Sequence, residues 1–133
     1  MKIIDIEGIG PAYAAKLQKA GIRTVEAILK NGATEKGRKE MAGHAGVTHK
    51  QVLEWVNRAD LYRIKGVARQ YSDLLENSGV DTVVELSNRV ADNLLAKMEQ
   101  VNKSKNLVNR MPTLKEVKSW ISQAKKLPRV VKY

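Results

Sequence analysis

The chain contains the same sequence pattern twice, and this repetition limits how it can fold. The segment Ile6–Val25 reads IEGIGPAYAAKLQKAGIRTV, and Ile64–Val83, 58 residues later, reads IKGVARQYSDLLENSGVDTV. Seven of the twenty positions are identical, and most of them are glycines or apolar residues. Identities of this kind indicate a duplicated structural unit.

A second pair of matching segments lies later in each copy. Thr48–Ala59 reads THKQVLEWVNRA and Thr113–Ala124 reads TLKEVKSWISQA, at an offset of 65 residues. The second copy has therefore gained seven residues between its two matched segments, within about residues 88–112.

The length of 133 residues fits one domain, or two very small domains packed together. We expect a single domain over residues 1–133, with repeat one at about 1–62 and repeat two at about 63–133.

The hydrophobic spacing predicts helices throughout and no strand. Thr48 with Gln51, and Thr113 with Glu116, have the spacing of capping boxes. We expect helices near residues 10–20, 24–31, 34–44, 48–62, 68–78, 82–88, 91–103 and 113–127.

Four further residues have the positions expected of helix ends. Gly21 and Gly79 fit left-handed C-terminal caps. Thr24 and Thr82 then fit N-caps of the helices that follow.

Trp55 and Trp120 occupy equivalent places beside two amphipathic stripes. We interpret both as core residues, because packing requires equivalent anchors in two repeats. A base-stacking role is the alternative.

A glycine turn opens the first copy. Gly8 and Gly10 flank Ile9, which we expect to point inward, and Pro11 suits the first position of a helix. Glycines allow close approach of an anion, and a helix N-terminus offers unpaired N–H groups to phosphate. The chain lacks the remaining residues of the nucleotide-binding glycine motifs. Lys16 lies within reach of a phosphate in this interpretation.

The residues IEGIGPAYAAKLQKAGI resemble the helix-hairpin-helix family of DNA-binding modules, which bind without sequence specificity. The resemblance implies that amides around Gly8, Ile9 and Gly10 contact a DNA phosphate. In some members hairpin carbonyls also bind a monovalent cation, and no other cofactor is implied. Lys16 falls where the family often has a basic residue. Ala12 and Glu7 depart from the family pattern.

The second copy is less similar to that family. Gly66 is kept, Val67 matches Ile9, and Ala68 replaces the second glycine, while Lys65 and Arg69 add positive charge. We expect this second turn, Lys65 to Arg69, to hold a phosphate less well through its backbone and better through its charge.

The chain as a whole resembles a bacterial or archaeal family of tandem helix-hairpin-helix repeats, described only as a domain of unknown function. The segments that begin at Gly46 and at Pro112 loosely resemble the later helices of the C-terminal domain of the RNA polymerase alpha subunit, a double helix-hairpin-helix unit. The fold implied is an all-α, compact bundle of two pseudo-symmetric helix-hairpin-helix repeats, of the SAM-like type.

The net charge of +10 predicts a polyanionic partner. From residue 103 onward there are nine basic residues and one acidic residue, so we expect this region to extend the contact through Lys103, Lys105 and Arg110. A solvated, lysine-rich surface is the alternative interpretation.

Other classes of function have little support. His44 and His49 have no cysteine and no paired carboxylate nearby, so we expect no metal site. We expect no enzyme and no catalytic residue, because the chain has no cysteine, no clustered carboxylates and no Asp segment like that of the related glycosylases. No apolar run reaches the ~18 residues of a membrane helix.

These observations lead to one expected function and one alternative. We expect a cytoplasmic protein that binds double-stranded DNA without sequence specificity, for which nucleoid association is an option. The alternative is a protein-interaction or assembly module, in which the glycine turns are structural and the basic face meets an acidic partner.

Overall fold

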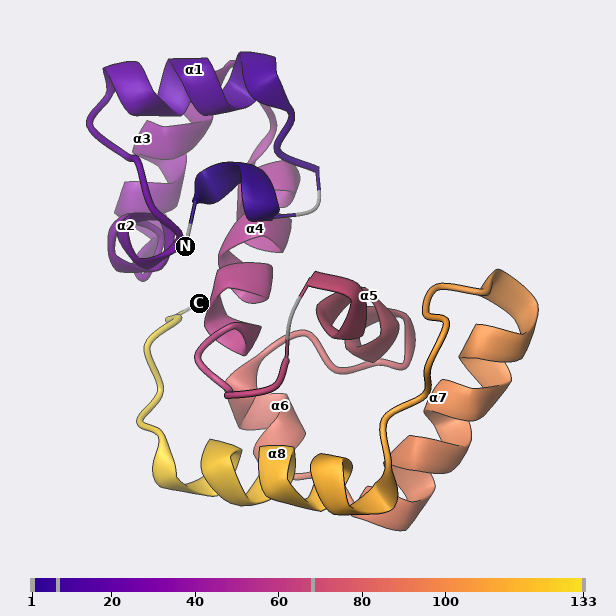
Figure 1. Ribbon diagram of the computed structural model, residues 1–133. Coiled ribbons are helices and arrows are strands. Elements are labelled where there is room, and N and C mark those ends of the chain that lie inside the picture. Colours follow the sequence, from indigo (N-terminus) through magenta and orange to yellow (C-terminus); the bar gives the residue numbers. More distant parts are fainter. Residues whose placement is uncertain (1, 7, 68, 133) are drawn as a thin grey trace. The chain divides into compact units, whose positions relative to one another are not determined.

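The structure is a computed structural model that describes residues 2–6, 8–67 and 69–132. Within these residues the regular structure is helical, and the one β-bridge, between Lys2 and Thr24, belongs to no strand (Figure 1). The all-α fold expected from the sequence is confirmed. The elements are η1 (Ile3–Asp5), α1 (Pro11–Lys19), α2 (Val25–Asn31), α3 (Glu35–Ala45), α4 (His49–Leu61), α5 (Arg69–Asn77), α6 (Val83–Ser87), α7 (Ala91–Lys105) and α8 (Leu114–Lys126).

The predicted helices all exist, and their ends differ from the predictions by at most two residues. The short 3-10 helix η1 was not predicted. Its only local signal is Asp5, whose carboxylate accepts a hydrogen bond from the Lys2 N–H at 3.1 Å.

Threonine caps begin five of the helices: four were predicted, and the fifth is Thr34 at the start of α3. Each hydroxyl oxygen accepts a hydrogen bond from the backbone N–H three residues later, at 3.0 to 3.2 Å. The two capping boxes are also present, because Gln51 and Glu116 accept the N–H groups of Thr48 and Thr113. Such caps satisfy N–H groups that a helix leaves unpaired.

Glycine ends the first helix of each copy, again as predicted. After α1, Gly21 has φ +86°, and the next N–H donates to the Leu17 carbonyl at 2.9 Å. After α5, Gly79 has φ +93°, and the next N–H donates to the Leu75 carbonyl at 2.9 Å. Both ends are Schellman motifs.

The chain divides into two compact units. The first unit is Met1–Asp60 with Arg129–Tyr133, and the second unit is Leu61–Pro128. The single domain expected from the sequence stays a prediction.

In the first unit, α1 and α2 both pack against α3, and α2 also contacts η1. Residues near the C-terminus complete this unit, since Val131 is buried and the Lys132 N–H donates to the Ala33 carbonyl at 2.8 Å. The buried Arg38 donates to the carbonyls of Gly32 and Lys132, at 2.8 Å each. Arg38 therefore ties the terminal segment to the α2–α3 corner.

In the second unit, α8 packs against α6 and α7, and α5 packs against α7. Trp120, Val117 and Leu94 belong to its continuous apolar core. Between its two matched segments the second unit is seven residues longer than the first. Helix α7 has 15 residues where α3 has 11, residues 106–113 replace the shorter connection 46–48, and α6 is two residues shorter than α2.

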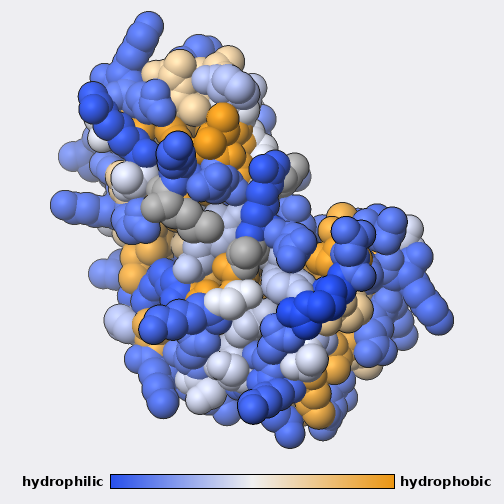
Figure 2. Space-filling model, viewed as in Figure 1, coloured by the Kyte–Doolittle hydropathy of each residue, from blue (hydrophilic) through white to orange (hydrophobic). Residues whose placement is uncertain are grey.

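Most of the face shown in Figure 2 is covered by hydrophilic residues, and hydrophobic ones appear there in separate patches. In the part of the chain that the structure describes, the large hydrophobic side chains classed as exposed are Ile4 and Val90, at 42% and 60%. Val90 is therefore the most exposed large apolar side chain of the second unit.

We expect Arg38→Met to lower the free energy of unfolding by about 2 kcal/mol, because two carbonyls lose charged hydrogen bonds in a buried place. Urea denaturation followed by circular dichroism measures this loss. Lys39→Met is the matched control, since Lys39 is exposed on the same helix and its ion pair with Glu35 is worth about 0–1 kcal/mol. Equal stability of the two variants would contradict the role of Arg38.

Candidate functional site

The first glycine turn is closed by a hydrogen bond from the Ile9 N–H to the Ile6 carbonyl, at 3.1 Å. Gly8 is exposed and has φ +92°, a conformation that L side chains rarely adopt. Ile9 is buried, as its inward-pointing role predicted. Glu7, the departure from the family pattern, lies outside the described residues.

The second glycine turn has the same construction. The Val67 N–H donates to the Ile64 carbonyl at 3.2 Å, and Gly66 is exposed with φ +95°. Val67 is buried. Ala68, which the sequence placed in this site, lies outside the described residues.

A tryptophan packs against the first turn. The Nε1 atom of Trp55 is 3.3 Å from the position that a Cβ on Gly8 would take. The ring of Tyr13 contacts the indole, with centroids 5.6 Å apart and a tilt of 49°. Trp55 is 3% exposed, so its predicted place in the core is confirmed.

A tryptophan packs against the second turn in the same way. The Nε1 atom of Trp120 is 2.9 Å from the position of a Cβ on Gly66. The ring of Tyr71 lies 5.3 Å from the indole, with a tilt of 50°. Trp120 is 2% exposed and is also a core residue, as predicted.

The start of α1 leaves backbone N–H groups open. Its N-cap, Gly10, has no side chain to cap the helix, and Pro11 has no N–H. Among the described residues, the N–H groups of Gly8, Gly10, Ala12 and Tyr13 have no acceptor. This is the donor arrangement that binds anions at helix N-termini.

At the second turn, the backbone N–H of Lys65 is not available to a ligand, because the Gln123 side chain binds it. The Gln123 Oε1 accepts the Lys65 N–H at 2.8 Å, and its Nε2 donates to the Lys65 carbonyl at 3.1 Å. Sequence reasoning missed this clamp. The available signal was that Gln123 stands where the first copy has Arg58.

The predicted cations near the turns are all exposed. Lys16 places its Nζ 3.7 Å from the Cβ position of Gly46, at the C-terminal end of α3. Lys65 and Arg69 flank the second turn, and a hollow of about 360 Å³ beside Arg69 also carries Asp73. Positive charge is therefore placed at the second turn more directly than at the first.

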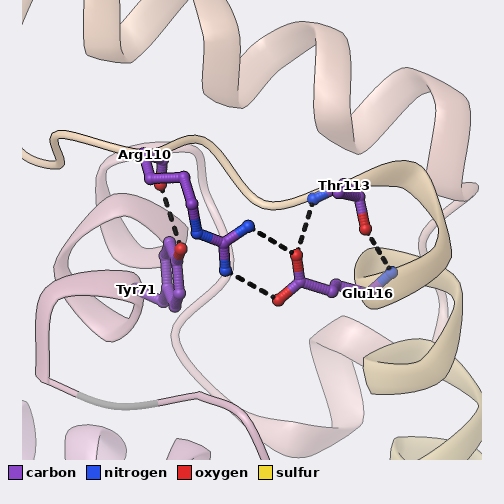
Figure 3. Close-up of polar contacts among 4 residues, drawn as sticks. All are labelled: Tyr71, Arg110, Thr113 and Glu116. Atoms are coloured by element: carbon purple, nitrogen blue, oxygen red, sulfur yellow. Dashed lines mark hydrogen bonds and ion pairs between the residues drawn. The ribbon is translucent and has the colours of Figure 1, made fainter.

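The three basic residues predicted to extend the contact differ in their partners. Lys103 is exposed near the end of α7, and the Lys105 Nζ donates to the Asn77 side chain at 2.6 Å. Figure 3 shows that the Arg110 guanidinium forms a two-fold pair with Glu116, at 3.0 and 3.2 Å. The Arg110 carbonyl accepts the Tyr71 hydroxyl at 3.0 Å. The positive charge of Arg110 is thus offset within the second unit.

The Arg110–Glu116 pair shifts the ionisation of both side chains. The hydrogen bond from Arg110, together with the backbone N–H of Thr113, lowers the pKa of Glu116 to about 2. The same hydrogen bond raises the pKa of Arg110. The pair therefore stays ionised at neutral pH.

A groove of about 430 Å³ lies in the second unit, between the start of α7 and α8. Arg89, Lys118 and Lys125 bring positive charge to it, and Val90 and Ile121 give it apolar surface. Because residues three, four and seven apart share a helix face, Lys118, Ser122 and Lys125 lie on the side of α8 opposite Trp120 and Gln123. The spacing of Lys118 and Lys125 could have predicted this basic face of α8, and the sequence analysis did not use it.

Residues 2–6, 8–67 and 69–132 contain no group of three or more His, Cys, Asp or Glu side chains placed to hold a metal ion. Over the same ranges, none of the helices combines the length and apolar character needed to cross a bilayer.

A family model described as a domain of unknown function, DUF4332, matches residues 7–127, and the chain belongs to this family. The resemblance to a family described only as a domain of unknown function is thereby confirmed, while its helix-hairpin-helix description stays a prediction. Comparison with curated proteins found no match, and comparison with solved structures found none either.

Alanine in place of Gly66 should lower the free energy of unfolding by about 2 kcal/mol, because φ +95° is strained for an L side chain and the new Cβ meets Trp120. Gly8→Ala should cost somewhat less, since its contact with Trp55 is longer. Urea denaturation measures both losses.

Gly10→Ser is the matched control for these variants. Apart from its chain neighbours, no atom of the described residues lies within 4 Å of its Cβ position, its φ is −82°, and serine caps helices better than glycine. A loss of stability as large as that of Gly66→Ala would contradict the structural distinction between the two glycines.

The carboxyl group of Glu116 should titrate near pH 2 in the folded chain, as measured by NMR of its side-chain carbon. Since this pKa is lowered from 4.5, the interaction stabilises the fold above about pH 4.5 and is lost as the pH falls toward 2. In Arg110→Gln the midpoint should rise but stay below 4.5, because Thr113 still donates. An unchanged midpoint in that variant would show that Arg110 does not cause the shift.

Proposed function

We propose that this chain, as a member of a family of unknown function, binds double-stranded DNA through the phosphate backbone and without sequence specificity. The observation that carries the proposal is the pair of exposed glycine turns, each leading directly into a nine-residue helix. The first of these helices has open N–H groups at its start, and the second has exposed cations beside it.

We further propose that the two units are diverged copies of one helix-hairpin-helix unit. In each, a glycine of positive φ closes a turn, a tryptophan edge packs against that glycine, and a tyrosine ring contacts the indole. The residues involved match at the offsets of 58 and 65 found in the sequence. A repeated contact set of this kind supports duplication more strongly than repeated helices alone.

Phosphate is the ligand that suits these donors. A helix N-terminus carries a partial positive charge and N–H groups directed outward, and an anion satisfies both. In the first turn the open N–H groups of Gly8, Gly10 and Ala12 supply the contact. In the second turn Lys65 has its amide bound by Gln123, so the Gly66 N–H and the side chains of Lys65 and Arg69 supply it.

The remaining charge supports a polyanionic partner. The net charge is +10, and Lys103 and Lys105 add exposed positive charge to α7. Arg110 adds less, because Glu116 pairs with it. Contacts of these kinds position a protein on the backbone and do not read bases, so the proposal includes no base preference. It assigns phosphate to N–H donors and includes neither a bound cation nor a catalytic step.

The groove beside α8 favours a second candidate function, which is binding of an acidic protein. Val90 is 60% exposed and lines this groove together with Arg89 and two lysines of α8. Apolar surface surrounded by positive charge suits an acidic segment with one apolar face. In this candidate the glycine turns are structural.

Binding to labelled duplexes of unrelated sequence should weaken steadily with salt, with a slope of log affinity against log salt of about −0.9 per phosphate contact. Lys65→Gln and Arg69→Gln should each make the slope less negative by about 0.9. Fluorescence anisotropy at several salt concentrations measures this. Lys30→Gln is the control, because Lys30 is exposed on α2 and far in sequence from either turn.

Three results separate the two candidates. Absence of binding at low salt contradicts DNA binding, and so does equal weakening by all three substitutions. Binding of an acidic peptide with a leucine-rich face, lost in Lys118→Glu and retained in Lys65→Gln, supports the protein partner instead.

A further inference from the structure

We infer that the indole N–H groups of Trp55 and Trp120 belong to the anion sites at the two turns, each donating a hydrogen bond to an oxygen of the bound phosphate. The inference rests on the proposed function and adds a side-chain donor to it. It assigns to two core residues a binding role as well as a packing role.

Each indole nitrogen is a donor without a partner that still reaches solvent. Trp55 and Trp120 are 3% and 2% exposed, and neither Nε1 has a hydrogen-bond acceptor among the described residues. In that same part of the chain, every side-chain nitrogen or oxygen fully enclosed from solvent has a partner. The small exposed fraction of each tryptophan therefore includes its Nε1.

The glycines uncover these nitrogens. Apart from its chain neighbours, the atoms within 4 Å of the Cβ position of Gly8 are Nε1 and Cδ1 of Trp55. At Gly66 the three nearest atoms all belong to Trp120, with Nε1 the closest at 2.9 Å. Both glycines are exposed, so an atom that approaches either turn meets the N–H edge of the indole. Any side chain at these positions would cover that edge.

The tyrosine rings fix the direction of the donors. Each ring lies against an indole with a tilt of about 50°, which holds the plane of the indole while its N–H edge faces the glycine. Tyr71 is in turn held by its hydroxyl, which donates to the Arg110 carbonyl. A donor fixed in this way loses little entropy when it binds a ligand.

The chemistry selects an anion. An indole nitrogen only donates hydrogen bonds, so it suits a phosphate oxygen and repels a metal or ammonium cation. The same donor is present in both units although the neighbouring charges differ, with Glu7 and Pro11 in one copy and Lys65 and Arg69 in the other. The shared feature of the two turns is thus a glycine beside an unpaired N–H.

The native chain itself provides the test, because it contains two tryptophans and so gives two indole N–H signals. The ¹⁵N-labelled full chain is titrated at low salt with a 12-base-pair duplex and, separately, with inorganic phosphate. Through-space contacts to the Hα atoms of Gly8 and Gly66 assign the signals. We expect both indole signals to move downfield and to saturate together with the turn amides.

The outcomes separate this inference from the proposed function. If the duplex binds and the turn amides shift while both indole signals stay in place, the indole role is wrong and DNA binding stands. If phosphate shifts the indole signals and no duplex binds, the anion sites stand and DNA binding is wrong. If neither ligand shifts any of these signals, both are wrong.

Trp55→Phe and Trp120→Phe keep an aromatic ring and remove the donor. Each should weaken duplex binding roughly tenfold, the effect of losing one hydrogen bond to a charged group. Ile28→Val is the control, since it alters a buried side chain of α2 that belongs to neither turn and should leave affinity unchanged. Unchanged affinity in a folded tryptophan variant overturns the inference, and the native titration decides where a variant does not fold.

Discussion

Each unit depends on the packing of a tryptophan edge against a turn glycine. The contact joins the first turn of a copy to a helix late in that copy, α4 in the first and α8 in the second. It requires a glycine twice over, because the φ of Gly8 and Gly66 is positive and because a Cβ would meet the indole. Within each copy, the helices that lie in sequence between the glycine and the tryptophan then cover the apolar surface that this contact leaves open.

The sequence predicted those structural features that form between residues close together along the chain. Threonine caps, capping boxes and Schellman motifs use hydrogen bonds between residues three to five apart, so residue spacing reveals them. The buried positions of Trp55 and Trp120 followed from their equivalence in two repeats. The repeated sequence pattern therefore made it possible to predict core residues by comparing two short segments.

The partners of the polar side chains could not be predicted in this way. Gln123 reaches the Lys65 peptide, and Arg38 reaches the Lys132 carbonyl across most of the chain. No spacing rule brings such residues together, since only the folded core places them side by side. Arg110 shows the consequence for function: counted as free positive charge in the sequence, it is paired with Glu116 in the structure.

Gly8 and Gly10, the two glycines of the first turn, are constrained differently. The fold explains the glycine at one of these positions and does not explain it at the other. Gly8 is required by the positive φ of the turn and by the contact with Trp55, so packing is enough to explain a glycine there. Gly10 has an ordinary φ and open space where a side chain would stand, so the fold does not require glycine there. The proposed function explains a glycine at this position, because it requires a phosphate to approach the start of α1 closely. In the proposed function, the second copy, which has Ala68 at this place in the sequence, relies instead on the charges of Lys65 and Arg69 and on the indole of Trp120.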